Sequence, residues 1–297
     1  VLQFNRPDIL YDVPKMLFSS NGPLALKWNY IPKMLPWILH YLKNCNTKSM
    51  LHTAKNMHQL LNLSMDAYEE IFQEIDTNGL VEKNGIIYIW TNKNLKSRNL
   101  EIKVRDDLGI KQKHLSQKEV LDLEPNLSPV FDAGVIYEKA MHARDPHGIL
   151  KKIFELYLKN GGNFIKENVN STQQINENET LIETEQKIYK FEKTVIASGA
   201  FSKKLTDQLG EKIPLDTERG YHVHFKNMDN LISRPVIFLD RGFGLTPMNQ
   251  GLRAVGTVEL GGTKNPITKK RVKYIVNCAK ELLPQLNEHS DEWLGFR

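Results

Sequence analysis

A turn of small residues is the first stretch of this sequence whose composition suits ligand binding. In TVIASGAFS, Val195 and Ile196 predict a buried strand, which ends in the turn Ala197, Ser198 and Gly199. Backbone can approach a phosphate or a ribose closely at such a turn. Many α/β turns have this composition, so the motif is weak when taken alone.

A second stretch, ERGYHVHF, alternates aromatic and polar side chains. On a strand, Tyr221, Val223 and Phe225 face one side, while His222 and His224 face the other. One interpretation is a core face with two surface histidines; the other is that Tyr221 or His222 lines a polar pocket. No third ligand pattern stands near the histidines, so we expect no metal site.

Two further stretches complete the candidate set. RGFGLTPMNQGLRAVGTVELGG predicts a hairpin that begins at Phe243, turns at 249–251 and returns to Glu259, whose role the sequence does not give. EWLGFR then resembles a strand that enters a site and ends on Arg297.

Composition and charge bound the class of protein. The chain has 297 residues, of which 40% are hydrophobic and 25% charged, as in globular proteins. The net charge is only +5, and the lysines and arginines are interspersed with acidic residues, so we expect no nucleic-acid partner. Cys45 and Cys278 lie far apart, which favours a reducing, intracellular location.

Residues 24–44 could contact a membrane surface. No apolar run reaches the roughly 18 residues that a membrane-spanning helix needs. The stretch PLALKWNYIPKMLPWILHYLKN places Trp28 and Trp37 beside lysines, which suits a membrane surface. A Pro-broken helix packed on the core is the alternative, and we favour it.

Periodicity predicts a mixed chain. Residues 24–77 and 95–109 read as helical, and Asn84-Gly85 predicts a hairpin between LVEK and IIYIW. Ser116 and Glu119 form a capping box.

Farther along the chain, Asp145 caps a helix that starts at Pro146 and runs to about Lys159, before a Gly-Gly turn and a strand. After Pro214 the chain is rich in strands, and a helix, ITKKRVKYIVNCAKELLPQL, follows. The fold class is therefore α/β (α+β), with interwoven parts.

Taken in order, these motifs resemble the FAD-dependent D-amino acid dehydrogenases of the wider amino acid oxidase and glycine oxidase superfamily. The resemblance rests on IASGAFS, PLDTERGYHVHF, RPVIFLD, GLTPMNQGLRAVGTVELGG and EWLGFR, and it covers essentially the whole chain. It implies an FAD-dependent oxidoreductase fold with interwoven FAD-binding and antiparallel-sheet substrate domains.

The resemblance also implies a domain division. Residues 1–130 are expected to form a mostly helical part plus hairpin on the substrate-domain side, and residues 131–212 part of the FAD-binding domain. Residues 213–265 are expected to form the antiparallel sheet of the substrate domain, and residues 266–297 a helix and a return strand toward the FAD-binding domain. Such relatives begin with a Gly-rich phosphate loop and continue beyond the W-x-G-x-R pattern. We therefore expect a chain truncated at both ends and inactive by itself.

Site roles follow residue by residue from the same resemblance. Arg297 matches the arginine that pairs with the substrate carboxylate, which a guanidinium fork binds bidentately. Phe243 falls where glycine oxidases place a substrate-contacting tyrosine, and Tyr221 and His222 lie on a strand near the flavin. The residues that match FAD contacts are Val169, Ala197, Ser198, Gly199, Thr246 and Met248.

The implied reaction is oxidative deamination of a D-amino acid to a 2-oxo acid and ammonia, by hydride transfer to flavin N5. The alternatives are a glycine/sarcosine-type oxidase, a 2-hydroxy acid dehydrogenase, or a non-catalytic module. The dehydrogenase branch implies a quinone electron acceptor and a cytoplasmic protein at the inner face of the plasma membrane.

Overall fold

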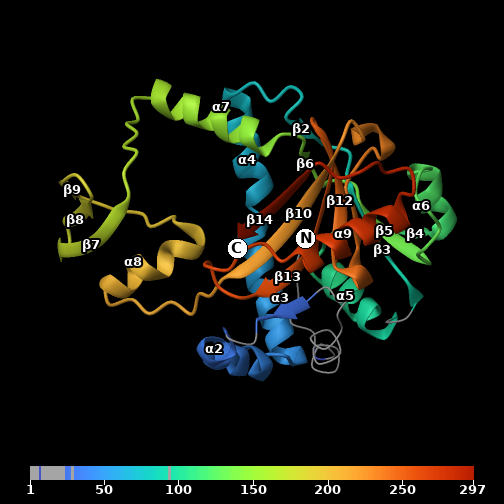
Figure 1. Ribbon diagram of the computed structural model, residues 1–297, viewed down its shortest axis with the longest axis horizontal. Helices are drawn as coiled ribbons and strands as arrows, with labels where there is room; N and C mark the ends of the chain where they lie inside the picture. Colours follow the sequence, from blue (N-terminus) through green and yellow to red (C-terminus); the bar gives the residue numbers. More distant parts are fainter. Residues whose placement is uncertain (1–6, 8–23, 28–29, 93–94) are drawn as a thin grey trace.

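The computed structural model describes Pro7 and residues 24–27, 30–92 and 95–297 (Figure 1). Trp28, one of the aromatic residues on which the membrane-surface prediction rests, lies outside these residues. The described helices are α2 (Ile31–Lys43), α3 (Thr47–Leu61), α4 (Ser64–Glu74), α5 (Leu95–Asp107), α6 (Gln117–Leu123), α7 (Pro146–Lys159), α8 (Ser202–Gln208) and α9 (Lys269–Leu282).

A nine-stranded mixed sheet forms the centre of the fold. Its strands run in the order β14-β10-β13-β12-β11-β3-β5-β4, and β1 pairs in parallel with β13. The bounds are β1 (Leu24–Leu26), β3 (Ile86–Trp90), β4 (Lys113–Ser116), β5 (Ala133–Tyr137), β10 (Glu218–Lys226), β11 (Val236–Phe238), β12 (Phe243–Met248), β13 (Gly251–Leu260) and β14 (Asp291–Phe296).

One face of this sheet carries the main core. Helix α9 packs on it through apolar side chains that recur at three- and four-residue steps, among them Val272, Ile275 and Ala279. Tyr221, Val223 and Phe225 of β10 face this helix and are fully buried, so the alternation predicted for this strand is confirmed. We call this side the α9 face and the opposite side, which carries His222 and His224, the histidine face.

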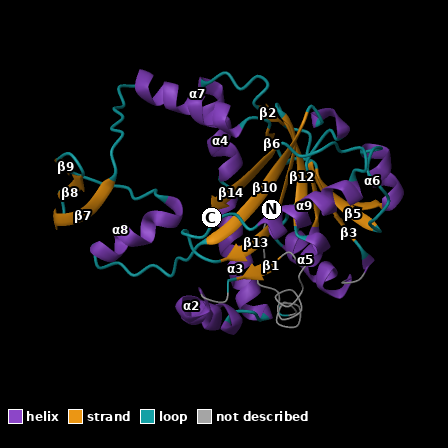
Figure 2. Cartoon of the chain, in the orientation of Figure 1, coloured by secondary structure: helices purple, strands orange, loops and turns teal. Residues whose placement is uncertain are grey.

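A smaller lobe stands apart from the sheet. It contains the three-stranded antiparallel sheet β7 (Val169–Asn176), β8 (Glu179–Thr184) and β9 (Ile188–Phe191), and α8 follows it. Figure 2 shows that extended loops join this lobe to the rest of the chain. Strand β5, which falls within the range 131–212 expected for the FAD-binding part, pairs with β3 and β4 in the large sheet, and the domain division stays a prediction.

Several predicted local signals are confirmed. Ser116 and Glu119 form the capping box at α6, and Asp145 caps α7 by accepting a hydrogen bond from the Gly148 N–H. The hairpin of β12 and β13 turns at 249–251, where Gly251 has φ +128°. The helix predicted after Pro214 is α9.

The hairpin predicted at Asn84-Gly85 is wrong. Gly85 has the expected positive φ, +83°, but the strands on either side of it diverge. The preceding strand, β2 (Val81–Glu82), pairs with β6 (His142–Ala143), whereas β3 pairs with β5 and β11. The turn is held by long-range contacts, because Asn84 donates to the Ser233 carbonyl and the Gly85 N–H donates to Ala140.

Two other local predictions are also wrong. Residues 24–26 form β1 and not a helix, because their backbone pairs with β13. Val195 and Ile196 do not form a buried strand. Residues 193–198 form no strand, because no described strand lies beside them to supply ladder hydrogen bonds. The Val195 side chain is 89% exposed.

Candidate functional site

The register of four neighbouring strands, β14, β10, β13 and β12, gathers one set of side chains on the histidine face. Directly opposed residues of antiparallel strands point to the same face. His222 is paired with Trp293 of β14, and His224 with Arg253 of β13. Arg253 is in turn paired with Thr246 of β12, so this predicted site residue shares the face.

Arg297 lies at one end of this face, beyond the last paired residue of β14. Its backbone exchanges two hydrogen bonds with Glu218, and its side chain crosses Gly220. A Cβ atom on Gly220 would approach the Arg297 Nε to 3.2 Å, so the glycine leaves room for the guanidinium. The side chain is 52% exposed, and its polar contacts are long: Glu218 Oε2 at 3.6 Å and the Thr257 carbonyl at 3.4 Å. This guanidinium retains donors for an external anion.

Trp293 and His222 form an aromatic stack on the same face. Their ring centroids lie 4.7 Å apart with an interplanar angle of 16°, and the His224 ring stacks on the other side of His222 at 5.1 Å. The Trp293 ring folds over Gly295, where any Cβ would collide with it. Gly295 is the cross-strand partner of Gly220, so this glycine pair underlies both Trp293 and Arg297.

The two histidines are held in the neutral form. Burial, together with the Arg253 and His224 charges, lowers the pKa of His222 to about 4. Burial also lowers the pKa of His224, whose Nε2 accepts a hydrogen bond from Arg253 Nε at 2.8 Å. Within the described part of the chain, no group of three histidine, cysteine or acidic residues could hold a metal ion.

The structure does not bring Tyr221 and Phe243 to Arg297. Both side chains lie on the α9 face, where they are buried within the main core. Phe243 lies near Phe238, with their rings 6.1 Å apart. The roles predicted for these two residues stay predictions, since their side chains point away from the face that carries Arg297.

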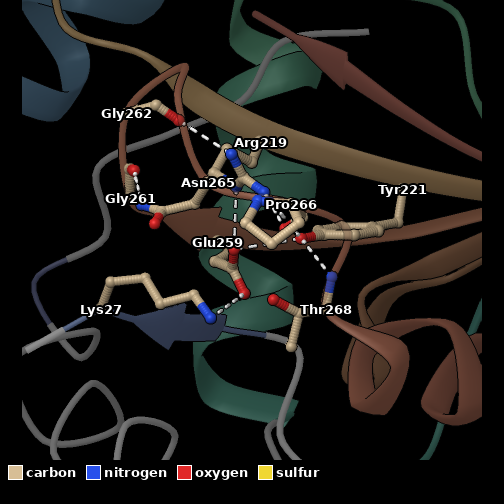
Figure 3. A network of polar contacts seen from close by, with 9 residues as sticks. All are labelled: Lys27, Arg219, Tyr221, Glu259, Gly261, Gly262, Asn265, Pro266 and Thr268. Carbon is tan, nitrogen blue, oxygen red and sulfur yellow. Dashed lines mark hydrogen bonds and ion pairs between the residues drawn. The ribbon is translucent and has the colours of Figure 1, made fainter.

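Tyr221 belongs to a buried polar network (Figure 3). Its hydroxyl donates to Glu259 Oε1 at 3.0 Å and accepts a hydrogen bond from the Thr268 N–H at 3.3 Å. Arg219 Nε donates to the same carboxylate oxygen at 2.8 Å, and both charged residues are almost completely buried. Glu259, to which the sequence assigned no role, is therefore the counter-charge of Arg219.

The rest of the Arg219 guanidinium holds the loop between β13 and α9. Nη1 donates to the Gly262 carbonyl at 3.0 Å and Nη2 to the Pro266 carbonyl at 2.7 Å. Lys27 lies 3.9 Å from the second Glu259 oxygen and brings the residue after β1 to the same point. The network thus ties the loop, β1 and β10 together, which is a structural task.

The residues predicted to contact FAD fall in two places. Thr246 and Met248 lie on β12, and alternation places both on the histidine face. Val169 begins β7 in the small lobe, and 197–199 follow the unpaired segment near that lobe. The set agrees with FAD in its chemistry, because the exposed turn at 197–199 offers backbone donors and Val195 an uncovered apolar side chain.

Some residues of the site were not found from the sequence. The surface around Arg297 is formed by Trp293, Gly220 and Gly295. The sequence did contain a pattern from which they could have been predicted. Residues 293, 295 and 297 alternate on one strand, and a glycine stands opposite the middle one. Arg219 was missed because nothing in a single sequence shows that an arginine is buried.

Comparisons with known proteins agree with one another. The family described as DAO, FAD dependent oxidoreductase, matches residues 25–297. The chain is 29% identical over 298 residues to a D-amino-acid oxidase of Bradyrhizobium diazoefficiens, covering 98% of this chain and 71% of the relative. It is 25% identical over 304 residues to a D-amino acid dehydrogenase of Vibrio vulnificus, covering 98% and 72%.

A solved structure shows the same fold. The glycine oxidase from Geobacillus kaustophilus superposes with a TM-score of 0.67 at 19% identity, covering 80% of this chain. The chain spans 64% of that protein's length, less than two thirds of it.

Proposed function

The chain belongs to the FAD dependent oxidoreductase (DAO) family, and from that premise we propose that it serves the oxidative deamination of D-amino acids. The substrate loses two electrons and two protons to become an imino acid, which water hydrolyses to a 2-oxo acid and ammonia. FAD supplies the electron-accepting chemistry in this family. The similarity to a D-amino-acid oxidase and to a D-amino acid dehydrogenase supports a D-amino acid as the substrate class.

The observation that carries the proposal is the state of Arg297. A half-exposed guanidinium whose contacts within the protein are all long is suited to bind a carboxylate through its fork of donors. Every amino acid substrate has a carboxylate on its reacting carbon, so holding it at Arg297 orients the Cα–H bond.

The stack beside Arg297 supplies the other half of the recognition. Trp293 is 53% exposed and presents an apolar surface, and His222 behind it is neutral. A neutral imidazole does not repel the ammonium group of a substrate. We assign Trp293 to contact the substrate side chain and His222 to hold the Trp293 ring in place.

The test is anaerobic reduction of the FAD-loaded protein by D-alanine, glycine, sarcosine and D-lactate, followed by the visible absorbance of the flavin. We expect D-alanine to reduce the flavin. Arg297→Ala should raise the half-saturating concentration by about 100-fold, since charge-assisted hydrogen bonds contribute about 1.5–3 kcal/mol. Arg297→Lys should raise it less, because one ammonium replaces the fork.

A matched control is Arg241→Ala, which removes a surface arginine paired with Glu281 at 2.6 Å. This variant should leave the half-saturating concentration unchanged. Reduction only by glycine and sarcosine, or only by D-lactate, would replace the D-amino acid with the corresponding alternative substrate. No reduction by any of the four would support a non-catalytic module.

We also propose that α2 contacts a membrane surface and that a quinone accepts the electrons. Three leucines are exposed along one side of α2: Leu35, Leu39 and Leu42. Met34 is the residue of this helix that is buried. This stripe supports the membrane-surface interpretation over packing on the core. No helix of the described chain is both long and apolar enough to cross a membrane.

Vesicle co-sedimentation tests the membrane contact. Wild-type protein should sediment with vesicles containing anionic lipid, and Leu39→Glu should reduce the bound fraction. Electron transfer to a soluble quinone, compared with oxygen, tests the acceptor. Equal sedimentation of both proteins, or reoxidation by oxygen alone, would reject the respective proposal.

A further inference from the structure

The ladder between β10 and β13 is interrupted by one residue in an unusual conformation. Thr257 has φ +58°, in the left-handed region that β-branched residues rarely adopt. The pairing shifts there: Tyr221 is opposite Gly256, whereas Gly220 is opposite Val258. Thr257 is therefore an extra residue on β13, which makes this position a β-bulge.

The side chains around the bulge would alternate correctly without it. Gly256 lies opposite Tyr221 on the α9 face, and Glu259 reaches Arg219 on that same face. With Thr257 removed, Gly256, Val258 and Glu259 would follow in regular alternation. The packing of the sheet does not require the insertion.

The Thr257 side chain makes no hydrogen bond that would compensate for its unfavourable backbone conformation. Its side chain is buried, yet the hydroxyl has no hydrogen-bond partner. Its N–H donates to the Gly242 carbonyl at 3.2 Å, and its carbonyl accepts from Arg297 Nη2 at 3.4 Å. Backbone strain in a native structure is retained where the surroundings impose it, and it is concentrated at functional sites.

We propose that Thr257 is a positioning residue for Arg297. The left-handed bulge turns the Thr257 carbonyl toward Arg297 Nη2 and holds the guanidinium over Gly220, so that the remaining donors face the substrate carboxylate. Glu218 contacts the guanidinium from the Nε side at 3.6 Å. The two contacts fix the direction of the fork without using all of its donors. This inference rests on the proposed role of Arg297 as the carboxylate-binding residue.

Three variants separate this role from a structural one. Deletion of Thr257 removes the bulge and its carbonyl, and Thr257→Pro fixes φ near −65° and turns the carbonyl away. Thr257→Gly is the matched control, because glycine adopts the left-handed conformation freely and keeps the carbonyl in place. Each is measured in the FAD-loaded protein.

Two readouts are used. The dissociation constant of pyruvate, a carboxylate of the product class, is obtained from the rise in melting temperature with its concentration. The half-saturating concentration and limiting rate of flavin reduction are obtained with D-alanine.

We expect the deletion and the proline variant to raise both the pyruvate dissociation constant and the D-alanine half-saturating concentration by about tenfold or more. The limiting rate should stay within about threefold. Thr257→Gly should leave both constants within about twofold and melt at or above the wild-type temperature, because it relieves strain.

The proposal is overturned if wild type binds pyruvate and the disrupted variants bind it equally well. It is also overturned if neither disrupted variant yields a folded flavoprotein, since the bulge is then required by the fold. Failure of the wild type to bind pyruvate or to react with D-alanine would reject the role of Arg297 itself, an outcome distinct from these.

Discussion

Two arginines at one end of the sheet have opposite surroundings. Arg219 of β10 is fully buried on the α9 face, where its guanidinium meets a carboxylate, two backbone carbonyls and a tyrosine hydroxyl. Arg297, next to the cross-strand partner of Arg219, is half-exposed on the histidine face and has two long contacts.

The difference separates a structural charge from a binding charge. A guanidinium that is buried and makes four hydrogen bonds within the protein has little left to offer a ligand. A guanidinium with free donors contributes little to stability but can bind an anion. The same contrast holds for the neighbours Tyr221, which is buried in the network, and His222, which faces the other way.

The largest expected effect is the loss of Arg219. Arg219→Leu leaves the Glu259 carboxylate buried without its ion pair at 2.8 Å. Lys27 at 3.9 Å, the Tyr221 hydroxyl and the charge of Arg271 still stabilise it in part. Breaking a buried ion pair costs about 3–5 kcal/mol, so the free energy of unfolding should fall by about that amount. Denaturation in urea measures it.

Arg297→Leu is the matched variant for this comparison. Its pair with Glu218 is exposed and long, so the free energy of unfolding should change by less than about 1 kcal/mol. The double variant Arg219→Leu, Glu259→Gln should recover part of the loss, because the buried carboxylate that lost its arginine is then neutral. Equal losses for the two single arginine variants would break the distinction between the faces.

A smaller effect is expected at Tyr221. Tyr221→Phe removes the hydrogen bonds to Glu259 and to the Thr268 N–H but keeps the buried ring. The free energy of unfolding should fall by about 1–3 kcal/mol, the cost of leaving a buried polar group unpaired. Measured on the FAD-loaded protein, the half-saturating concentration for D-alanine should not change. A large rise in the half-saturating concentration, with an unchanged free energy of unfolding, would support the role in the site that was predicted for Tyr221.

These contrasts show which parts of the molecule a single sequence could predict. The capping box at Ser116, the Asp145 cap and the alternation of β10 were predicted because each depends on residues close together in the chain. The hairpin at Asn84-Gly85 failed because a turn does not determine which strands pair, and here long-range partners do.

The candidate site divides in the same way. Arg297 and His222 were named from motifs, and register then placed both on one face. Tyr221 and Phe243 were named from position along the same motifs, which does not show the face to which a side chain belongs. The bulge at Thr257 adds one residue to β13, and such an insertion becomes visible only when the partner strand is known.

The smallest expected effect concerns His222 and pH. Burial is the main cause of its low pKa of about 4, and the Arg253 and His224 charges lower it further. At neutral pH the ring is uncharged in both the folded and the unfolded chain, so stability is unaffected. Between about pH 6.5 and 4 the unfolded chain binds a proton that folded His222 does not, so stability falls as the pH is lowered.

His222→Phe keeps a ring against Trp293 and removes this proton uptake. The free energy of unfolding of the variant should therefore decline less steeply between about pH 6.5 and 4 than that of wild type. His224 also has a lowered pKa, from burial and Arg253 and against the opposing charge of Asp291, so some decline remains. Urea denaturation at several pH values measures the two slopes. Identical slopes would mean that His222 is solvated like a surface histidine, and the histidine face would then lack the desolvated stack on which substrate packing against Trp293 depends.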